Sequence, residues 1–167
     1  KSGANVLFVD EEIFPQNLAV IQTRALPQGM KIQVGNYKEL EFTPEIFACI
    51  LQYPNASGSV EDYREFMEKA HAAHCKVAVD ADIMSLALLV PPGEWGADIV
   101  FGSTQRLGIP LFYGGPSAAY FATRDEYKRN MPGRIIGWSK DKYGKLAYRM
   151  ALQTREQHIN CLLYTSP

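Results

Sequence analysis

Short apolar runs alternate with helix-like segments along this chain, and that alternation constrains the fold more than any other feature of the sequence. The strand-like runs cover residues 6–9, 30–34, 76–79, 97–101 and 118–122. Apolar residues recur at helical spacing in two of the intervening segments, 15–25 and 59–74. Because strands that alternate with helices form a sheet covered by helices, the sequence predicts a three-layer α/β fold with a mainly parallel sheet.

The remaining elements have less certain types or boundaries. The apolar run 46–52 fits either a buried strand or the end of a short helix, and its length does not separate the two. Ser59 followed by Asp62 resembles a helix-start box, and the charged run 124–129 predicts a further helix. The last predicted elements are a strand pair and its turn, at 134–137, 146–152 and 142–144.

Composition excludes several classes of partner. The 167 residues carry 17 basic and 18 acidic side chains, well mixed, for a net charge of −1, so the sequence predicts neither nucleic-acid binding nor attachment to an acidic membrane. No run approaches the roughly 20 apolar residues of a membrane span. The length suits one domain or a piece of one. Because the chain begins at Lys1 without a methionine, we expect it to be cut from a longer protein.

The cysteines and histidines do not form a recognisable site. Three widely spaced cysteines without a CxxC pair indicate buried thiols in a reducing compartment, with neither a disulfide framework nor a zinc site. They are Cys49, Cys75 and Cys161. His71 and His74 lie three residues apart on one predicted helix, where surface histidines are the commoner interpretation, so no metal site is predicted.

Two acids and a glycine pair stand where an α/β sheet places ligands. Asp82 follows the predicted strand 76–79, and ligands bind at the carboxyl ends of such strands. Asp80, two residues earlier, is an alternative candidate for a ligand-binding carboxylate. A third interpretation is that Asp82 caps a helix that begins near residue 83. The pair Gly114 and Gly115 permits close backbone approach to a ligand or to a neighbouring subunit, and a tight structural turn is the alternative.

Several longer motifs go beyond these generic patterns. They are PPGEWGADIV at 91–100, GSTQR at 102–106, YGGP at 113–116, FATR at 121–124, MPGR at 131–134 and QTREQHI at 153–159. Together they strongly resemble the amino-terminal half of the glycine decarboxylases, the P-protein family of the glycine cleavage system. The resemblance covers residues 1–159. Residues 160–167 bear no relation to the family, so we expect a non-native tail there.

The resemblance implies an enzyme, glycine dehydrogenase (aminomethyl-transferring). The family decarboxylates glycine on pyridoxal phosphate and passes the aminomethyl group to the lipoyl arm of the H-protein. It implies the aspartate-aminotransferase-like fold, the pyridoxal phosphate fold of type I, of whose large domain this chain would be a truncated part. The implied location is the cytoplasm in a bacterium and the mitochondrion in a eukaryote.

The resemblance also implies that this half holds no cofactor. In the cofactor-bearing half a lysine forms the Schiff base, and the same spacing here places Gln105, whose amide has no basic lone pair with which to form an imine. Asp82 falls at the position of the carboxylate that holds the ring nitrogen protonated. Ser103, Gly114 and Gly115 are further relict positions. We therefore expect pyridoxal phosphate to be bound by the other, lysine-bearing half or subunit.

The same resemblance suggests contacts with that other half. The candidate interface or channel residues are Tyr113, Arg134, Arg155 and His158. For Arg134 and Arg155, pairing with carboxylates within the chain is the alternative. One departure from the family is Ser117, where the family has histidine.

Two other functions remain open at this stage. The chain could be an independent pyridoxal enzyme that uses another lysine, for which Lys76 and Lys140 are candidates. It could also be a regulatory or binding module that kept a relict of the fold.

Overall fold

The computed structural model describes residues 3–114, 117–131 and 135–150, which divide into two compact units, 1–124 and 125–167. The first unit is an α/β domain whose elements are β1 (Val6–Asp10), α1 (Pro15–Ala25), β2 (Lys31–Gly35), β3 (Ile46–Tyr53), α2 (Arg64–Ala72), β4 (Lys76–Ala81), β5 (Ile99–Ser103) and β6 (Ala119–Thr123). Short 3-10 helices at Leu26–Gln28, Tyr37–Glu39, Ser85–Ala87, Pro92–Trp95 and Gln105–Leu107 connect them. The predicted alternation of strands and helices is confirmed.

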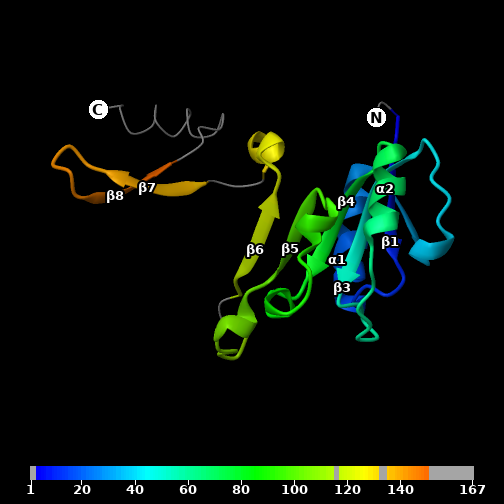
Figure 1. Cartoon of the computed structure of the whole chain (residues 1–167), viewed down its shortest axis with the longest axis horizontal. Helices are drawn as coiled ribbons and strands as arrows, with labels where there is room; N and C mark the ends of the chain where they lie inside the picture. The colour runs from blue at the N-terminus through cyan, green and yellow to red at the C-terminus, as the bar shows by residue number, and fades with distance from the viewer. Residues whose placement is uncertain (1–2, 115–116, 132–134, 151–167) are drawn as a thin grey trace. The chain divides into compact units, whose positions relative to one another are not determined.

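The six strands form one sheet in the order β2-β1-β3-β4-β5-β6, shown in Figure 1. Every pair is parallel except β5 with β6, which is antiparallel. The chain leaves β1 through α1 toward β2 and later leaves β3 through α2 in the opposite direction. Because such crossovers are right-handed, the two helices cover opposite faces of the sheet, which gives the three predicted layers.

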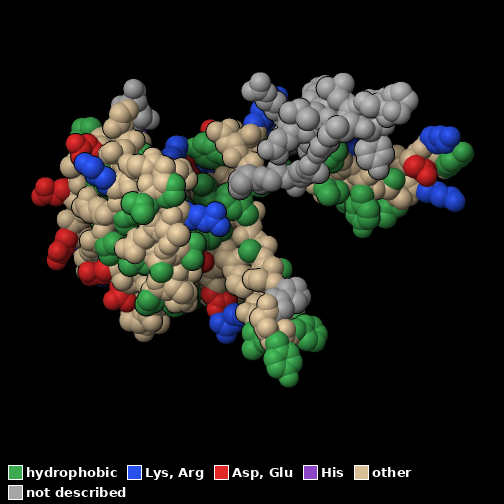
Figure 2. Space-filling model, turned by 180° about the vertical axis from the view of Figure 1, so that it is seen from behind, with side chains coloured by type: hydrophobic (Ala, Val, Ile, Leu, Met, Phe, Trp, Pro, Cys, Tyr) green, Lys and Arg blue, Asp and Glu red, His purple; other side chains and the backbone are tan. Residues whose placement is uncertain are grey.

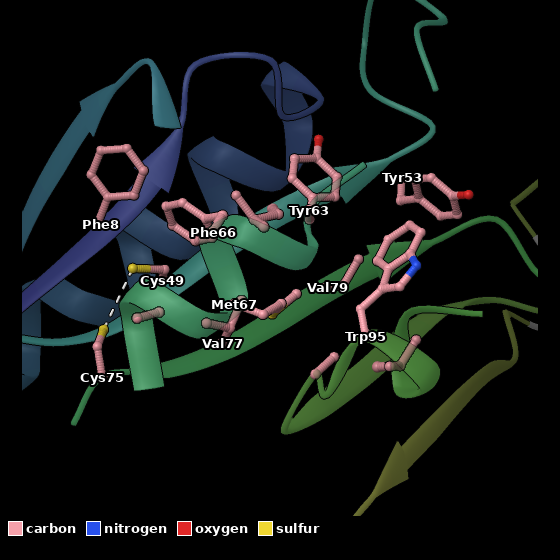
Figure 3. Close-up of a cluster of buried hydrophobic side chains, with 14 of the residues drawn as sticks. Phe8, Cys49, Tyr53, Tyr63, Phe66, Met67, Cys75, Val77, Val79 and Trp95 are labelled. Atoms are coloured by element: carbon pink, nitrogen blue, oxygen red, sulfur yellow. Dashed lines mark hydrogen bonds between the residues drawn. The ribbon is translucent and has the colours of Figure 1, made fainter. Parts of the chain in front are cut away.

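The hydrophobic core lies between the sheet and α2, as Figure 3 shows. Residues of β3 and β4 alternate between this face and the other, with Cys49, Leu51, Val77 and Val79 buried against α2. Successive aromatic rings extend the core, and the Tyr53 and Trp95 rings meet edge to face at 4.8 Å between centroids. This face is therefore closed by residues of the chain itself.

The opposite face, toward α1, is closed less completely. On this face Val9 and Gln52 are buried, but Ala48, Ile50, Ala78, Ile99 and Phe101 are only half-buried. Helix α1 buries Ala25 alone among its side chains. The described residues thus leave this side of the sheet partly open.

Several predicted boundaries need correction. The ambiguous run 46–52 is strand β3, and the helix expected from the box at Ser59 begins only at Arg64. The Asp62 carboxylate accepts from the Arg64 amide at 3.1 Å, in a local turn of the backbone. In the second unit, the charged run expected to be a helix is a 3-10 helix at Asp125–Asn130.

The predicted strand pair of the second unit is present as an antiparallel hairpin of β7 (Ile136–Lys140) and β8 (Leu146–Met150). No helix in the described part of the chain is long and apolar enough to cross a membrane.

Candidate functional site

A polar cluster lies at the carboxyl end of β4, on the side of the sheet that α1 covers. The Asn17 amide of α1 donates to Asp80 Oδ2 at 2.5 Å, and the Gln52 amide of β3 donates to the Asp80 backbone carbonyl at 3.0 Å. Burial raises the pKa of Asp80 to about 6, because the charged carboxylate loses solvation there. The cluster places a carboxyl group that titrates near neutral pH at the edge where α/β sheets bind ligands.

Asp82 lies beyond the end of β4 and has different surroundings. Its Oδ2 forms an ion pair with the Arg106 guanidinium, which follows β5. Its Oδ1 accepts from the Met84 amide at 3.0 Å, so Asp82 also organises the turn that leads into the 3-10 helix Ser85–Ala87. Strand β4 ends at Ala81, so the two acids do not continue one strand face.

The loop after β5 holds the position predicted to lack a lysine. Gln105 begins the 3-10 helix Gln105–Leu107 and is exposed, and its backbone amide donates to the Ser103 hydroxyl at 3.1 Å. Gly114 has a left-handed backbone at φ +87°, a conformation that favours glycine. Gly115 lies outside the described residues.

Strand β5 passes unusually close to β4 at Gly102. A Cβ atom at this position would lie 2.2 Å from the Ala81 carbonyl oxygen and 2.8 Å from the Tyr120 ring. The Tyr120 hydroxyl donates to the same carbonyl at 2.6 Å. Gly102 is therefore required by this approach, which brings the loop with Gln105 beside the β4 carboxyl end.

Among the interface candidates, only Tyr113 lies within the described residues. Its side chain is fully exposed, and the backbone of Phe112 and Tyr113 is left-handed at φ 37° and 52°. Leu107, Leu111 and Phe112 are also exposed, and Figure 2 shows hydrophobic side chains gathered at the tip of this loop. Arg134, Arg155 and His158 lie outside the described residues, as does Cys161.

His71 and the two described cysteines occupy structural positions. His71 contacts the buried Asp98 at 3.0 Å through Nε2. Cys49 and Cys75 are buried with their sulfur atoms 3.5 Å apart and form no disulfide, as the sequence predicted for thiols (Figure 3). No group of three metal-ligating side chains is placed to hold an ion within the ranges that the structure describes.

The two alternative lysines lie in different parts of the fold. Lys76 is the first residue of β4, so it lies at the other end of this strand from Asp80, and its Nζ contacts Asp98 at 3.2 Å. Lys140 is the last residue of β7, in the second unit.

Sequence reasoning missed the groups that engage the two acids. Asn17, Gln52 and Arg106 come from three different elements, and no spacing in the sequence relates them. The one available signal was the parallel-sheet prediction itself, because it brings the ends of successive strands to one edge.

Solved structures of similar fold define the class of protein. Cystathionine gamma-lyase from Lactobacillus plantarum is 19% identical with a TM-score of 0.53, over 60% of this chain and 28% of that one. Cystathionine gamma synthase from Xanthomonas oryzae pv. oryzae is 18% identical with a TM-score of 0.56. The match covers 72% of this chain and 32% of that one. The chain has the α/β fold of the pyridoxal phosphate enzymes of fold type I, as the resemblance implied.

Sequence comparisons identify one family within this fold class. The sequence profile of the glycine cleavage system P-protein matches residues 1–166, so the chain belongs to the glycine cleavage system P-protein family. Glycine dehydrogenase (decarboxylating) of Bacteroides thetaiotaomicron is 80% identical over 159 residues, 95% of this chain and 17% of the relative. The mitochondrial glycine dehydrogenase (decarboxylating) of Dictyostelium discoideum is 53% identical over 157 residues, which are 94% of this chain and 16% of the relative.

A solved structure of the same family agrees. Glycine decarboxylase (P-protein) of the glycine cleavage system, in inhibitor-bound form, is 33% identical with a TM-score of 0.82. The match covers 95% of this chain and 38% of that one. The chain thus spans about one sixth of the length of the curated relatives that it matches.

The residues at the sheet edge do not fit pyridoxal phosphate held as a Schiff base. The loop from Ser103 to Gly114 contains no lysine, and Gln105 cannot form the imine. Both acids that could face a ring nitrogen are engaged within the chain, Asp80 by Asn17 and Asp82 by Arg106.

Proposed function

We propose that this chain is part of a glycine decarboxylase and supports its active site without holding the cofactor. The observation that carries the proposal is the loop after β5, which has Gln105 where a cofactor-bearing half has lysine, in a chain of the P-protein family. In the proposed whole protein, another half or subunit with the lysine binds pyridoxal phosphate. Glycine is the substrate, and the lipoylated H-protein receives the aminomethyl group.

The direct test locates the Schiff base in a full-length P-protein that carries this segment. Borohydride reduces the imine to a stable amine, and peptide mapping then identifies the labelled lysine. We expect one labelled lysine per cofactor, outside residues 1–167. Label at Lys76 or Lys140 would overturn the proposal. Gln105→Ala should leave the stoichiometry of the label unchanged, because the side chain takes no part in the imine.

A second test addresses glycine and the H-protein. The full-length protein should release carbon dioxide from carboxyl-labelled glycine only when lipoylated H-protein is present. Release that does not depend on the H-protein, or an absence of release with both present, would contradict the proposed partners.

We also propose that the exposed tip of the β5–β6 loop contacts the lysine-bearing half. Tyr113 is the most exposed of the described hydrophobic side chains at this tip, and aromatic anchors contribute strongly to interfaces. Tyr113→Ala should weaken association of the halves about tenfold. Tyr143→Ala is a matched control, because Tyr143 is also exposed, at 75%, and lies in a different turn. Equal effects of the two substitutions would refute the contact. Arg134, Arg155 and His158 are further candidates from the family resemblance.

The relatives suggest where such a protein works. They include bacterial enzymes and one named as mitochondrial. We propose a cytoplasmic location for a bacterial protein and a mitochondrial one for a eukaryotic protein, which fractionation followed by immunoblotting would test.

A further inference from the structure

The β7–β8 hairpin gathers large apolar side chains on one of its two faces. Directly opposite residues of an antiparallel pair lie on the same face, and the register places Trp138 opposite Tyr148. Residues two positions along each strand share that face. The large apolar side chains placed there define what we term the hairpin face, which consists of Ile136, Trp138, Leu146, Tyr148 and Met150.

All five side chains of the hairpin face are exposed. Trp138 is 75% exposed and Tyr148 is 83% exposed, and Figure 2 shows hydrophobic side chains along this hairpin. The small residues Gly137, Ser139 and Ala147 lie on the other face, which offers little apolar surface. A two-stranded hairpin on its own is marginally stable in water, and packing of one face against another element stabilises it. The hairpin face therefore requires a cover.

The charge of the hairpin indicates what kind of surface covers it. Residues 136–150 contain one acid, Asp141, and four basic residues, Lys140, Lys142, Lys145 and Arg149. The Asp141 carboxylate accepts from the Tyr143 amide at 2.8 Å and from the Lys145 amide at 2.9 Å, so it serves the turn itself. A complementary partner surface has an apolar centre and carboxylates at its rim.

The exposure of the hairpin face favours a permanent neighbour over a carrier that binds and leaves. A carrier would return five large apolar side chains to water at every dissociation, which costs free energy in proportion to the apolar area. The chain spans about one sixth of the length of its curated relatives, so a protein of that length contains ample further chain to supply a permanent cover.

We propose that the hairpin face packs against an apolar surface with an acidic rim on the lysine-bearing half of the P-protein. The inference rests on the proposed function, which supplies that half. It assigns a docking surface to the second unit, whereas the loop tip with Tyr113 belongs to the first.

The first test is hydroxyl-radical footprinting of a full-length P-protein that carries this segment, without H-protein. Tyr148 lies on the hairpin face, whereas Tyr143 lies in the turn, where the Lys142 ammonium stands 4.9 Å from its ring centroid. The two tyrosines are 83% and 75% exposed in this chain, so they form a matched pair. We expect Tyr148 to be oxidised several-fold more slowly than Tyr143. Equal rates, or protection that appears only when H-protein is added, would overturn the proposal.

The second test identifies the covering surface. A carbodiimide joins a lysine to a carboxylate that it contacts, and peptide mapping identifies both partners. We expect Lys140, Lys142 or Lys145 to be joined to acids of the half whose lysine borohydride labels. Cross-links only within residues 1–167, of the same or of a second copy, would overturn the proposal, as would an absence of cross-links.

A substitution separates the hairpin face from the turn. Trp138→Ala should raise the oxidation rate of Tyr148 several-fold in the full-length protein, because it removes the ring opposite Tyr148, whereas Tyr143→Ala should leave that rate unchanged. Equal effects of the two substitutions would contradict the proposal. The two measurements on the unaltered protein decide the matter if Trp138→Ala does not fold.

The outcome also separates this inference from the proposed function. A borohydride label within residues 1–167 overturns the proposed function. A label outside these residues, combined with an unprotected Tyr148 or with missing cross-links, overturns the hairpin contact alone.

Discussion

Asn17 on α1 donates a hydrogen bond to the Asp80 carboxylate on β4 at 2.5 Å. The bond ties the first helix of the chain to the middle of the sheet, across 63 residues of sequence. It also occupies one of the two acids that stand where the fold binds ligands, so the arrangement has direct consequences for stability.

Asp80→Asn should make the chain less sensitive to pH. The pKa of Asp80 rises from 3.8 to about 6 on folding, so the folded state binds the proton more tightly than the unfolded state. This contribution to stability is complete below about pH 4 and is lost as the pH rises through 6. We therefore compare the stability of Asp80→Asn with that of the unaltered chain at each pH. From pH 4 to pH 7 this difference should shift by about 1–2 kcal/mol in favour of the variant.

Urea denaturation at a series of pH values measures this difference. Asn17→Ala is the companion variant, because it removes the donor and should steepen the loss of stability between pH 4 and 7. An unchanged pH profile in Asp80→Asn would contradict the expectation.

Gly102→Ala should destabilise the fold by about 1–3 kcal/mol or more. The added methyl group would meet the Ala81 carbonyl oxygen at 2.2 Å, a backbone atom held in β4, so the strands must move apart. Gly93→Ala is the control, since nothing lies within 4 Å of a Cβ there. Chemical denaturation of the two variants compares them, and equal midpoints would refute the steric argument.

Asp98→Asn should cost about 3 kcal/mol, because the buried carboxylate accepts from three donors. They are the Val77 amide at 2.9 Å, His71 Nε2 at 3.0 Å and Lys76 Nζ at 3.2 Å. Burial alone would raise the pKa of Asp98, but these bonds outweigh it and hold the pKa below 3.8. The stabilisation is therefore present above about pH 4 and is lost as the pH falls through the lower, folded-state pKa.

The matched control for Asp98 is Glu65→Gln in α2. Glu65 pairs with Lys69 at 2.7 Å, but both side chains are exposed, so the substitution should cost far less than Asp98→Asn. Thermal unfolding at pH 7 measures both variants. A similar cost for the two would show that the Asp98 contacts add little.

Cys49 and Cys75 should resist alkylation in the folded chain. Both are buried, and the hydrogen bond between them, followed by burial, raises the pKa of Cys49, so little reactive thiolate forms. Iodoacetamide treatment with mass mapping should label these two cysteines in denaturant and leave them unlabelled without it. Rapid labelling under native conditions would contradict the described packing.

Local patterns in the sequence predicted those elements whose determinants are local. Helix α1 spans 15–25 as expected, because Pro15 suits the first turn and the apolar spacing persists to Ala25. Strand β3 could not be separated from a helix, because its residues are apolar on both faces, so the run shows no alternation of apolar and polar residues. The helix start near Ser59 was wrong because the Asn55 side chain accepts from the Ser59 amide at 2.8 Å in a turn.

The candidate site was predictable only in part. Their place at the end of the predicted strand 76–79 put Asp80 and Asp82 at the ligand-binding edge, and the family resemblance marked Gln105. Nothing in the sequence indicated that Asn17 would engage Asp80 or that Arg106 would engage Asp82, because these contacts depend on tertiary packing.

The unequal closure of the two sheet faces implies an order of assembly. The α2 side contains a core that these residues complete themselves, whereas Ile50 and Phe101 on the α1 side stay half-buried. In the proposed whole protein, other segments can dock on that half-covered surface. We therefore expect the α2 side to gain protection from hydrogen exchange early in folding, and the α1 side only after the rest of the protein has arrived.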